Sequence, residues 1–432
     1  MNTKQKNTYY PNGAICTEKF YKDKLLHLEG EPAYRRWHKD GHLLREEYYF
    51  NGVRHRDDGP AALSYNRDGI LITMAFYLNN QLEREDGPAI QKFYKDGTLR
   101  EENYYRFGKL NNDGLTIRKW HPNGQIKCEK YLYVKEESYF SDYYNKYITN
   151  TYNRYHNADG PAHQEWYEDG RLKKIVYYVN GQLHREEEPA RQEWHKNGTD
   201  KTIIYSQNNR FHHTTKPARQ DWFEDGHPKL ECWMQHGNTY RSDNMPAITS
   251  WYENHQLKCV AYYTTTYHSH REDGPVLQLW YSDGTKKEVI YQIHGQYHNV
   301  GAPAVQRWHA NGNRETEAWY VRGSTSYKTN TPYQRWDKDG NLLHIKEVNG
   351  RTKTITSWHN NLTMKYKKYY KICNNRCSCI DLKSCDHYID YEYHNEDGPA
   401  IQEWDEDGNL IKAEWMLNGK KFESLTKACK SF

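Results

Sequence analysis

The sequence predicts an all-β protein, an elongated array of antiparallel hairpin repeats that form a curved, twisted sheet. Three observations carry this prediction: one phrase recurs at a fixed period, turn signals recur within each period, and the segments between the turns are rich in Tyr, Trp, Ile and Val without helix caps. The array is expected to cover residues 9–419, after a tail at 1–8 and before a C-terminal cap at 420–432.

A proline marks most repeats, usually within the phrase Asp-Gly-Pro-Ala or a decayed copy of it. Most neighbouring prolines of the series lie 28 or 29 residues apart: Pro32, Pro60, Pro88, Pro161, Pro189, Pro217, Pro246, Pro275, Pro303 and Pro399. Leu115 and Thr331 hold the proline position in degenerate copies, and a worn copy surrounds Trp358. A period of this length indicates stacked units of one supersecondary structure.

An aromatic residue follows each proline position after five residues. This aromatic column has 13 members: Trp37, Tyr65, Phe93, Trp120, Trp166, Trp194, Trp222, Trp251, Trp280, Trp308, Trp336, Trp358 and Trp404. A glycine four residues later, usually after Asp or Asn, gives a tight turn, and an aromatic pair such as Tyr177-Tyr178 then precedes an Asn-Gly-like turn. Each unit is therefore expected to be a strand, a tight turn, a second strand and a second turn, which gives about 13 repeats.

Composition argues against a thick core and against several classes of protein. Mean hydropathy is -1.17, yet aromatics make up 15% of the chain and the net charge is only +4, so the chain is expected to fold. Its 61 basic and 57 acidic residues are interleaved, which does not indicate a dedicated nucleic-acid binder. The N-terminal residues lack the apolar stretch of a signal peptide and no apolar run has the length of a membrane span, so a soluble, cytoplasmic protein is expected.

A resemblance to a known family follows from one well-formed unit. Residues 178–185, Tyr-Val-Asn-Gly-Gln-Leu-His-Arg, together with Pro189-Ala-Arg-Gln-Glu-Trp194, resemble the MORN (membrane occupation and recognition nexus) repeat. The cadence also looks like repeat proteins of large DNA viruses and phages, which implies a viral origin. The resemblance implies an elongated sheet of stacked hairpins. The family's G-x-G and shorter unit are replaced here by Asp-Gly-Pro-Ala and a longer unit, so its membrane-lipid role is not carried over.

A histidine lies five residues before most proline positions, often followed by arginine, as in His184-Arg185 and His270-Arg271. One interpretation is a ladder of imidazoles and guanidiniums that binds an anionic lipid or polyanion. The other is that these side chains fix the loop of every hairpin, and it is favoured because a residue needed in every repeat is usually needed by the repeat.

Glutamine and tryptophan alternate on one face of the first strand of many repeats. They either pack as the core of a thin sheet or line a concave aromatic face that binds a peptide or sugar. The candidates for binding are Trp166, Trp194, Trp222, Trp280, Trp308, Gln192 and Gln220.

Two insertions, near residues 136–153 and 373–390, each lengthen a repeat by 18 residues at the Asn-Gly turn. The first carries many Tyr residues and is either a recognition loop or an extra hairpin. The second contains Cys373, Cys377, Cys379, Cys385 and His387, which can enclose one structural Zn²⁺. Disulfides and free thiols are the alternatives for these cysteines.

No spacing typical of a catalytic motif occurs, so no catalytic residue is nominated. A short helix after Gly419, with Phe422, Leu425, Cys429 and Phe432 on one face, is expected to cap the array. The leading functional hypothesis is a non-enzymatic scaffold that binds a protein partner through the concave aromatic face or the insertions. The alternative is a peripheral binder of anionic membrane lipid or polyanion through the His/Arg ladder.

Overall fold

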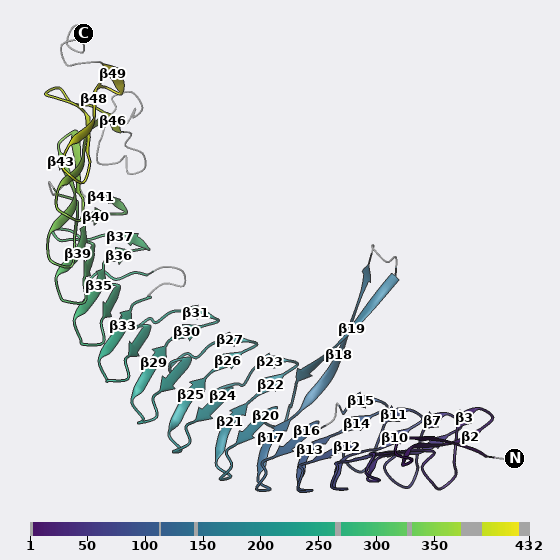
Figure 1. Cartoon of the computed structure of the whole chain (residues 1–432). Coiled ribbons are helices and arrows are strands. Elements are labelled where there is room, and N and C mark those ends of the chain that lie inside the picture. The colour runs from purple at the N-terminus through teal and green to yellow at the C-terminus, as the bar shows by residue number, and fades with distance from the viewer. Residues whose placement is uncertain are drawn as a thin grey trace. The chain divides into compact units, whose positions relative to one another are not determined.

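A computed structural model describes residues 3–111, 114–141, 146–263, 269–325, 331–372 and 391–422, and every regular element in those ranges is a β-strand (Figure 1). The all-β prediction is thus confirmed. None of the described residues belongs to a helix that could cross a membrane. Contacts divide the chain into two compact units, residues 1–214 with 221–226 and residues 215–220 with 227–432.

In the first unit, long strands pair in chain order into an open antiparallel meander. These strands are β1 (Lys4–Tyr9), β2 (Ile15–Lys22), β4 (Tyr34–Trp37), β5 (Leu43–Glu47), β8 (Ala62–Tyr65), β9 (Leu71–Ala75), β12 (Ile90–Phe93), β13 (Leu99–Asn103), β16 (Ile117–Trp120), β17 (Ile126–Lys130), β20 (His163–Trp166), β21 (Leu172–Val176), β24 (Arg191–Trp194) and β25 (Asp200–Ile204). The array therefore already includes Lys4, within the segment expected to be a tail.

Short strands of the first unit lie between the long ones. They are β3 (Leu25–Leu26), β6 (Tyr49–Phe50), β7 (Val53–Arg54), β10 (Tyr77–Leu78), β11 (Gln81–Leu82), β14 (Tyr105–Arg106), β15 (Lys109–Leu110), β22 (Tyr178–Val179), β23 (Gln182–Leu183), β26 (Ser206–Gln207) and β27 (Arg210–Phe211). Except for β3, which pairs with β2, they form two-stranded hairpins at the Asn-Gly-like turns.

The second unit repeats this plan. Its long strands are β29 (Pro228–Cys232), β32 (Ile248–Trp251), β33 (Leu257–Ala261), β34 (Leu277–Trp280), β35 (Lys286–Ile290), β38 (Val305–Trp308), β39 (Arg314–Ala318), β42 (Tyr333–Trp336), β43 (Leu342–Asn349), β44 (Thr352–Trp358), β45 (Met364–Ile372), β47 (Ile401–Trp404) and β48 (Leu410–Leu417). The shorter strands are β30 (Met234–Gln235), β31 (Asn238–Thr239), β36 (Gln292–Ile293), β37 (Gln296–Tyr297), β40 (Tyr320–Val321), β41 (Ser324–Thr325), β46 (Tyr391–Tyr393) and β49 (Lys420–Phe422). Strand β28 (Arg219–Trp222) lies where the two units divide.

Most of the residues without exposed area are small and directly precede the first strand of a tight-turn hairpin. The residue after the proline position is fully buried in nine repeats: Ala33, Ala61, Ala89, Ala162, Ala190, Ala218, Ala247, Ala304 and Ala400. Its carbonyl accepts a hydrogen bond from the first residue of the aromatic pair, for example from Tyr177 to Ala190 at 2.8 Å. Both faces of the long strands are otherwise largely half-buried, which explains how so polar a sequence folds.

Each tight-turn hairpin carries a β-bulge beside the aromatic column. Trp166 pairs with Leu172 and Glu165 pairs with Lys174, so Lys173 is left without a partner in the ladder. The same shift of register recurs in the other hairpins of this kind whose pairing is described. A bulge leaves one extra residue whose side chain is aimed differently from its neighbours.

The C-terminal end of the array differs from the prediction made from the sequence. The predicted capping helix is not seen: residues Lys420–Phe422 form β49, which pairs with β48, and Leu425, Cys429 and Phe432 lie outside the described residues. Strand formation here follows from Asn418-Gly419, which supplies the positive φ values of a hairpin turn.

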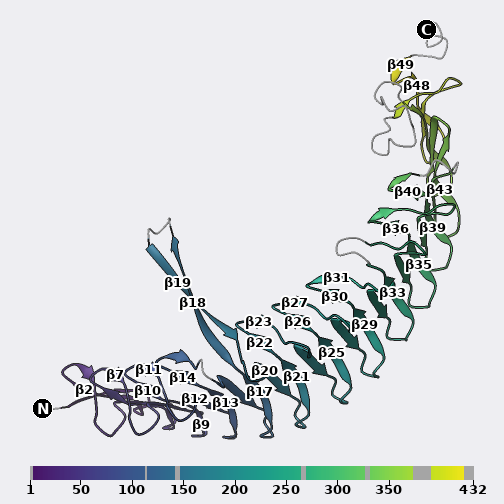
Figure 2. The same ribbon diagram turned by 180° about the vertical axis from the view of Figure 1, so that it is seen from behind.

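The first insertion forms a hairpin of its own. Strands β18 (Leu132–Ser141) and β19 (Lys146–Tyr155) pair over their full length of ten residues each, in place of a short hairpin with two residues in each strand. The extra-hairpin interpretation is confirmed, although the ladder stands apart from the meander instead of widening it. Figures 1 and 2 both show it projecting from the row of hairpins on the side of the short hairpins.

Candidate binding site

The histidine column joins successive repeats. In seven repeats the imidazole Nδ1 accepts a hydrogen bond from a turn N–H 24 residues further on, at 3.1–3.3 Å: His27, His55, His156, His184, His270, His298 and His394. An Nδ1 that accepts a hydrogen bond belongs to an imidazole whose proton is on Nε2. Burial and the nearby Arg322 lower the pKa of His298, which favours that neutral form.

The arginine after the histidine packs inside its own loop. The Arg185 guanidinium carbon lies 3.9 Å from the centroid of the Tyr177 ring, and its Nη1 donates to the carbonyl of Pro189 at 3.3 Å. Arg271 stacks in the same way on Tyr262 at 4.0 Å. These cations therefore fill a space between an aromatic ring and the proline backbone.

In the repeats that carry Asp-Gly-Pro-Ala, the glycine leaves room for the guanidinium, whereas Glu188 precedes the proline in the repeat of Arg185. A Cβ added to Gly274 would lie 2.9 Å from Cζ of Arg271, and one added to Gly59 would lie 3.1 Å from Cζ of Arg56. The Asp of the same phrase accepts from the guanidinium, as Asp273 does from Arg271 at 3.0 Å.

The aromatic column and the glutamines are half-buried in every repeat, including Trp166, Trp194, Trp222, Trp280, Trp308, Gln192 and Gln220. Gln220 donates to Glu231 on the adjoining strand at 3.4 Å. The tryptophans' backbone carbonyls also accept bonds from the preceding repeat. The donor is the hydroxyl of a Tyr or the Nε2 of a His that comes one residue after the aromatic position of the preceding repeat. The pairs of donor and acceptor residues are Tyr10 with Trp37, Tyr94 with Trp120, His121 with Trp166, Tyr167 with Trp194, His195 with Trp222, Tyr252 with Trp280, Tyr281 with Trp308, His309 with Trp336 and His359 with Trp404.

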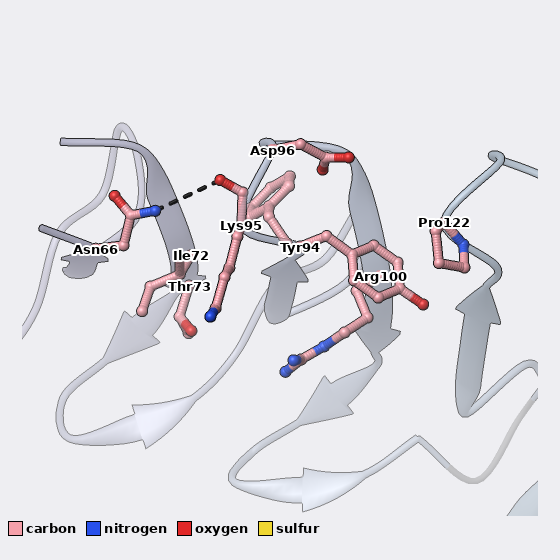
Figure 3. Close-up of a pocket in the computed structure, with 9 residues that line it drawn as sticks. Asn66, Ile72, Thr73, Tyr94, Lys95, Asp96, Arg100 and Pro122 are labelled. Carbon is pink, nitrogen blue, oxygen red and sulfur yellow. Dashed lines mark hydrogen bonds between the residues drawn. The ribbon is translucent and has the colours of Figure 1, made fainter. Parts of the chain in front are cut away.

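Two hollows lie at equivalent places between hairpins of the first unit. One, of about 640 Å³, is lined by Phe93, Tyr94 and Arg100, and Figure 3 shows Tyr94 and Arg100 between Lys95 and Pro122. The other, of about 530 Å³, is lined by Trp166, Tyr167, Lys127 and Lys173 among others. Equivalent positions of the repeat, among them the aromatic column and the residue that follows it, thus line both hollows.

Unpaired residues of the β-bulges bring cations to these hollows: Arg100 lines the first, and Lys127 and Lys173 line the second. We define the bulge column as the residues seven positions after the aromatic column that the ladder leaves unpaired. In the first unit its members are Leu44, Ile72, Arg100, Lys127, Lys173 and Lys201, and the four cations are exposed. In the second unit its members are Lys258, Lys287, Glu315, Leu343, Lys365 and Ile411. The sequence-based predictions do not include this column, although aligning the repeats on their Trp residues reveals it.

The long hairpin is anchored at its base and exposed towards its tip. Oγ1 of the fully buried Thr116 accepts from the Leu132 N–H at 2.8 Å, and Tyr155 stacks on His163 and Tyr178. Burial, with Lys174 and Lys130 nearby, lowers the pKa of His163 to about 4, so this stack holds a neutral imidazole at neutral pH. The strands beyond carry exposed aromatics: Tyr139 at 52%, Phe140 at 47%, Tyr147 at 74% and Tyr152 at 41%.

The predicted zinc ligands Cys373, Cys377, Cys379, Cys385 and His387 lie outside the described residues. Among the residues that are described, no group of three or more His, Cys, Asp or Glu side chains could hold a metal ion. The zinc site therefore stays a prediction of the sequence.

No protein-family model and no curated protein matches the chain, so the MORN resemblance also stays a prediction. Among solved structures, the crystal structure of TcdB2-TccC3-Cdc42 aligns with 95% of this chain at 12% identity and a TM-score of 0.12. That of TcdB2-TccC3 aligns with 95% at 11% identity and a TM-score of 0.10. In both cases the alignment covers 23% of the other chain, so this chain spans about a quarter of its length. TM-scores this low establish no shared fold.

Proposed function

We propose that the protein is a non-enzymatic repeat scaffold that binds a protein partner, and that hairpin β18–β19 is its main contact. The observation that carries the proposal is the exposure of four aromatic side chains on this one hairpin. A two-stranded hairpin is marginally stable alone in water, and exposed aromatic clusters usually mark contact surfaces.

The register of the hairpin divides the aromatics between its two faces. Tyr139 pairs with Ile148 and Tyr152 with Lys135, and these pairs share one face; Phe140 pairs with Tyr147 on the other face near the tip. The charges lie nearer the base, where Lys135 and Arg154 both approach Glu137. A partner that covers the outer half would bury the rings of Tyr139, Phe140 and Tyr147 and leave these ion pairs in place. Tyr152 lies opposite Lys135, nearer the base.

The His/Arg ladder contributes to the repeat more than to a partner surface. The histidines in question accept turn N–H groups, and the arginines are stacked on rings within the loop. We therefore place protein binding on the hairpin and not on this ladder.

Affinity capture from the native cell with quantitative mass spectrometry tests the proposal. One variant replaces residues 134–153 by Asn-Gly, which joins Tyr133 to Arg154 as in the neighbouring short hairpins, and a second carries Y139S, F140S, Y147S and Y152S. Both should lose the same enriched proteins. The control carries S138A, T149A, T151A and N153A, which alter polar positions of the same hairpin, and should keep them. If the shortened variant captures the same proteins as the native chain, the proposal is wrong.

A further inference from the structure

The bulge column differs from the other columns of the repeat because its chemistry changes along the chain. It is apolar at Leu44 and Ile72, and then basic in four successive hairpins of the first unit, at Arg100, Lys127, Lys173 and Lys201. The repeat folds with leucine or isoleucine at this position, so folding does not require the basic residues. A contiguous block of one chemistry within a variable column indicates a ligand.

The four cations are available to such a ligand. All four are exposed, and Lys173 pairs with Glu165 at 3.2 Å. Within the described part of the chain, Arg100, Lys127 and Lys201 form no ion pair. The second hollow has five lysines and two glutamates in its lining, a net charge of +3.

The spacing of the cations is fixed by the sheet. The hairpins that carry them are hydrogen-bonded in order, through β13 with β16, β17 with β20 and β21 with β24. The long hairpin does not interrupt this order, because β17 pairs directly with β20. Two strand spacings of 4.7–4.9 Å give a pitch of about 9.4–9.8 Å per cation.

A polyproline II helix has the matching pitch. It has three residues per turn and a rise of about 3.1 Å, so every third side chain lies on the same side at intervals of about 9.3 Å. In a β-strand, residues three apart point to opposite faces. Nucleic-acid phosphates recur about every 3.4 Å along a strand, so one cation per repeat would leave most of them unmatched.

Aromatic rings lie beside the cations of this column, as binding of prolines requires. Nζ of Lys173 lies 5.9 Å from the centroid of the Tyr167 ring, beside Trp166 in the second hollow. Phe93 and Tyr94 line the first hollow together with Arg100. Grooves lined by aromatics are the usual docking sites for proline-rich segments in this conformation.

We propose that the bulge column from Arg100 to Lys201 binds an acidic, proline-rich polypeptide segment in the polyproline II conformation, with an acidic side chain at every third residue. This inference rests on the proposed function, since it names the chemistry of a protein partner, but it uses a second surface of the scaffold.

The test uses the full chain and a labelled peptide of four Glu-Pro-Pro repeats, with fluorescence anisotropy as the readout. We expect binding that weakens with added salt. A peptide of the same composition with its four glutamates adjacent should bind at least about tenfold more weakly, because only one or two of its charges can meet the column.

Variants locate the site. The variant R100Q, K127Q, K173Q and K201Q should weaken binding by about thirtyfold, since each exposed charge pair contributes a factor of about two to three. The control K4A, K6A, K24A and K39A removes four exposed lysines of the same unit outside the column and should bind like the native chain. Circular dichroism checks that both variants keep their strands.

Three results would overturn the inference: no binding of the spaced peptide, equal binding of the clustered peptide, or unchanged binding by the glutamine variant. Tighter binding of a single-stranded oligonucleotide of equal charge, lost in the same variant, would assign the column to nucleic acid and also overturn it. The capture experiment on β18–β19 is independent of these peptides. If the capture experiment fails and the peptide binds as expected, only the assignment of hairpin β18–β19 as the main contact is wrong.

Discussion

The loop that carries Asp-Gly-Pro-Ala and the bulge column lie in the same repeats and differ in how they vary. In the loop, the alanine, the stacked arginine and the histidine recur along the chain and bond to their own or the next repeat. In the bulge column, apolar, basic and acidic residues occupy the same position of different repeats, four basic residues of the first unit are consecutive members of the column, and the cations face solvent. A residue that recurs along the chain and bonds within the array has a stabilising role. An exposed position whose chemistry differs between groups of repeats indicates binding.

The largest expected change in unfolding free energy comes from a leucine placed in the Asp-Gly-Pro-Ala loop, compared with a leucine placed in the bulge column. Ala190→Leu adds three carbons at a fully buried position and should cost about 3 kcal/mol of unfolding free energy. Lys201→Leu, at an exposed bulge position where Leu44 already occurs in another repeat, should change it by less than about 0.5 kcal/mol.

Urea unfolding and hydrogen exchange of the segment around residues 177–194 measure this difference. Exchange is needed because stability in a repeat array is a sum of local terms and the loss will be greatest near the substitution. Equal destabilisation by the two variants would remove the distinction between the regions.

An intermediate loss of unfolding free energy is expected when Arg271 is replaced. Asn299, at the equivalent position of the next repeat, indicates the control substitution. Arg271→Ala removes the stack on Tyr262 and the bonds to Asp273 and the Pro275 carbonyl, and should cost about 1–2 kcal/mol. Arg271→Asn should cost about half as much or less, because Asn299 donates to the Pro303 carbonyl at 3.1 Å in the same role.

Hydrogen exchange of the loop at residues 269–276 reports the outcome. Faster exchange in the alanine variant with near-native protection in the asparagine variant supports a structural role. An alanine variant as well protected as the native chain would free Arg271 for the alternative role in binding an anion.

The sequence predicts the repeat, its turns and its class well, because a strict period and Gly at positive φ leave little choice. Gly170 at φ 83° and Gly198 at φ 92° both lie in the predicted tight turns. The bonds across repeats are harder to foresee, since the donor to the Trp194 carbonyl is Tyr167, 27 residues earlier. The bulge also escapes the period-two pattern of a strand: it leaves Lys173 unpaired and thereby creates the exposed column. The spacing of apolar residues alone predicts a capping helix. The hairpin turn at Asn418-Gly419 instead pairs the first residues after it, Lys420–Phe422, as a strand with β48.

The smallest expected effect extends the basic block by one repeat. Ile72 holds the bulge position in the hairpin that precedes the one with Arg100, and β9 pairs with β12 directly, so Ile72→Lys adds a fifth cation at the same pitch. The variant should bind a peptide of five Glu-Pro-Pro repeats about two- to threefold more tightly than the native chain does, with stability changed by less than about 0.5 kcal/mol. Ile72→Gln is the control, because it removes the apolar side chain without adding charge, and should not tighten binding. Titrations of both variants with the peptide at low and high salt separate the effect of charge from that of packing. If the tighter binding persists at high salt, or if the glutamine variant also binds more tightly, the charge of the bulge column does not determine the affinity. The contrast between this column and the loop would then be wrong.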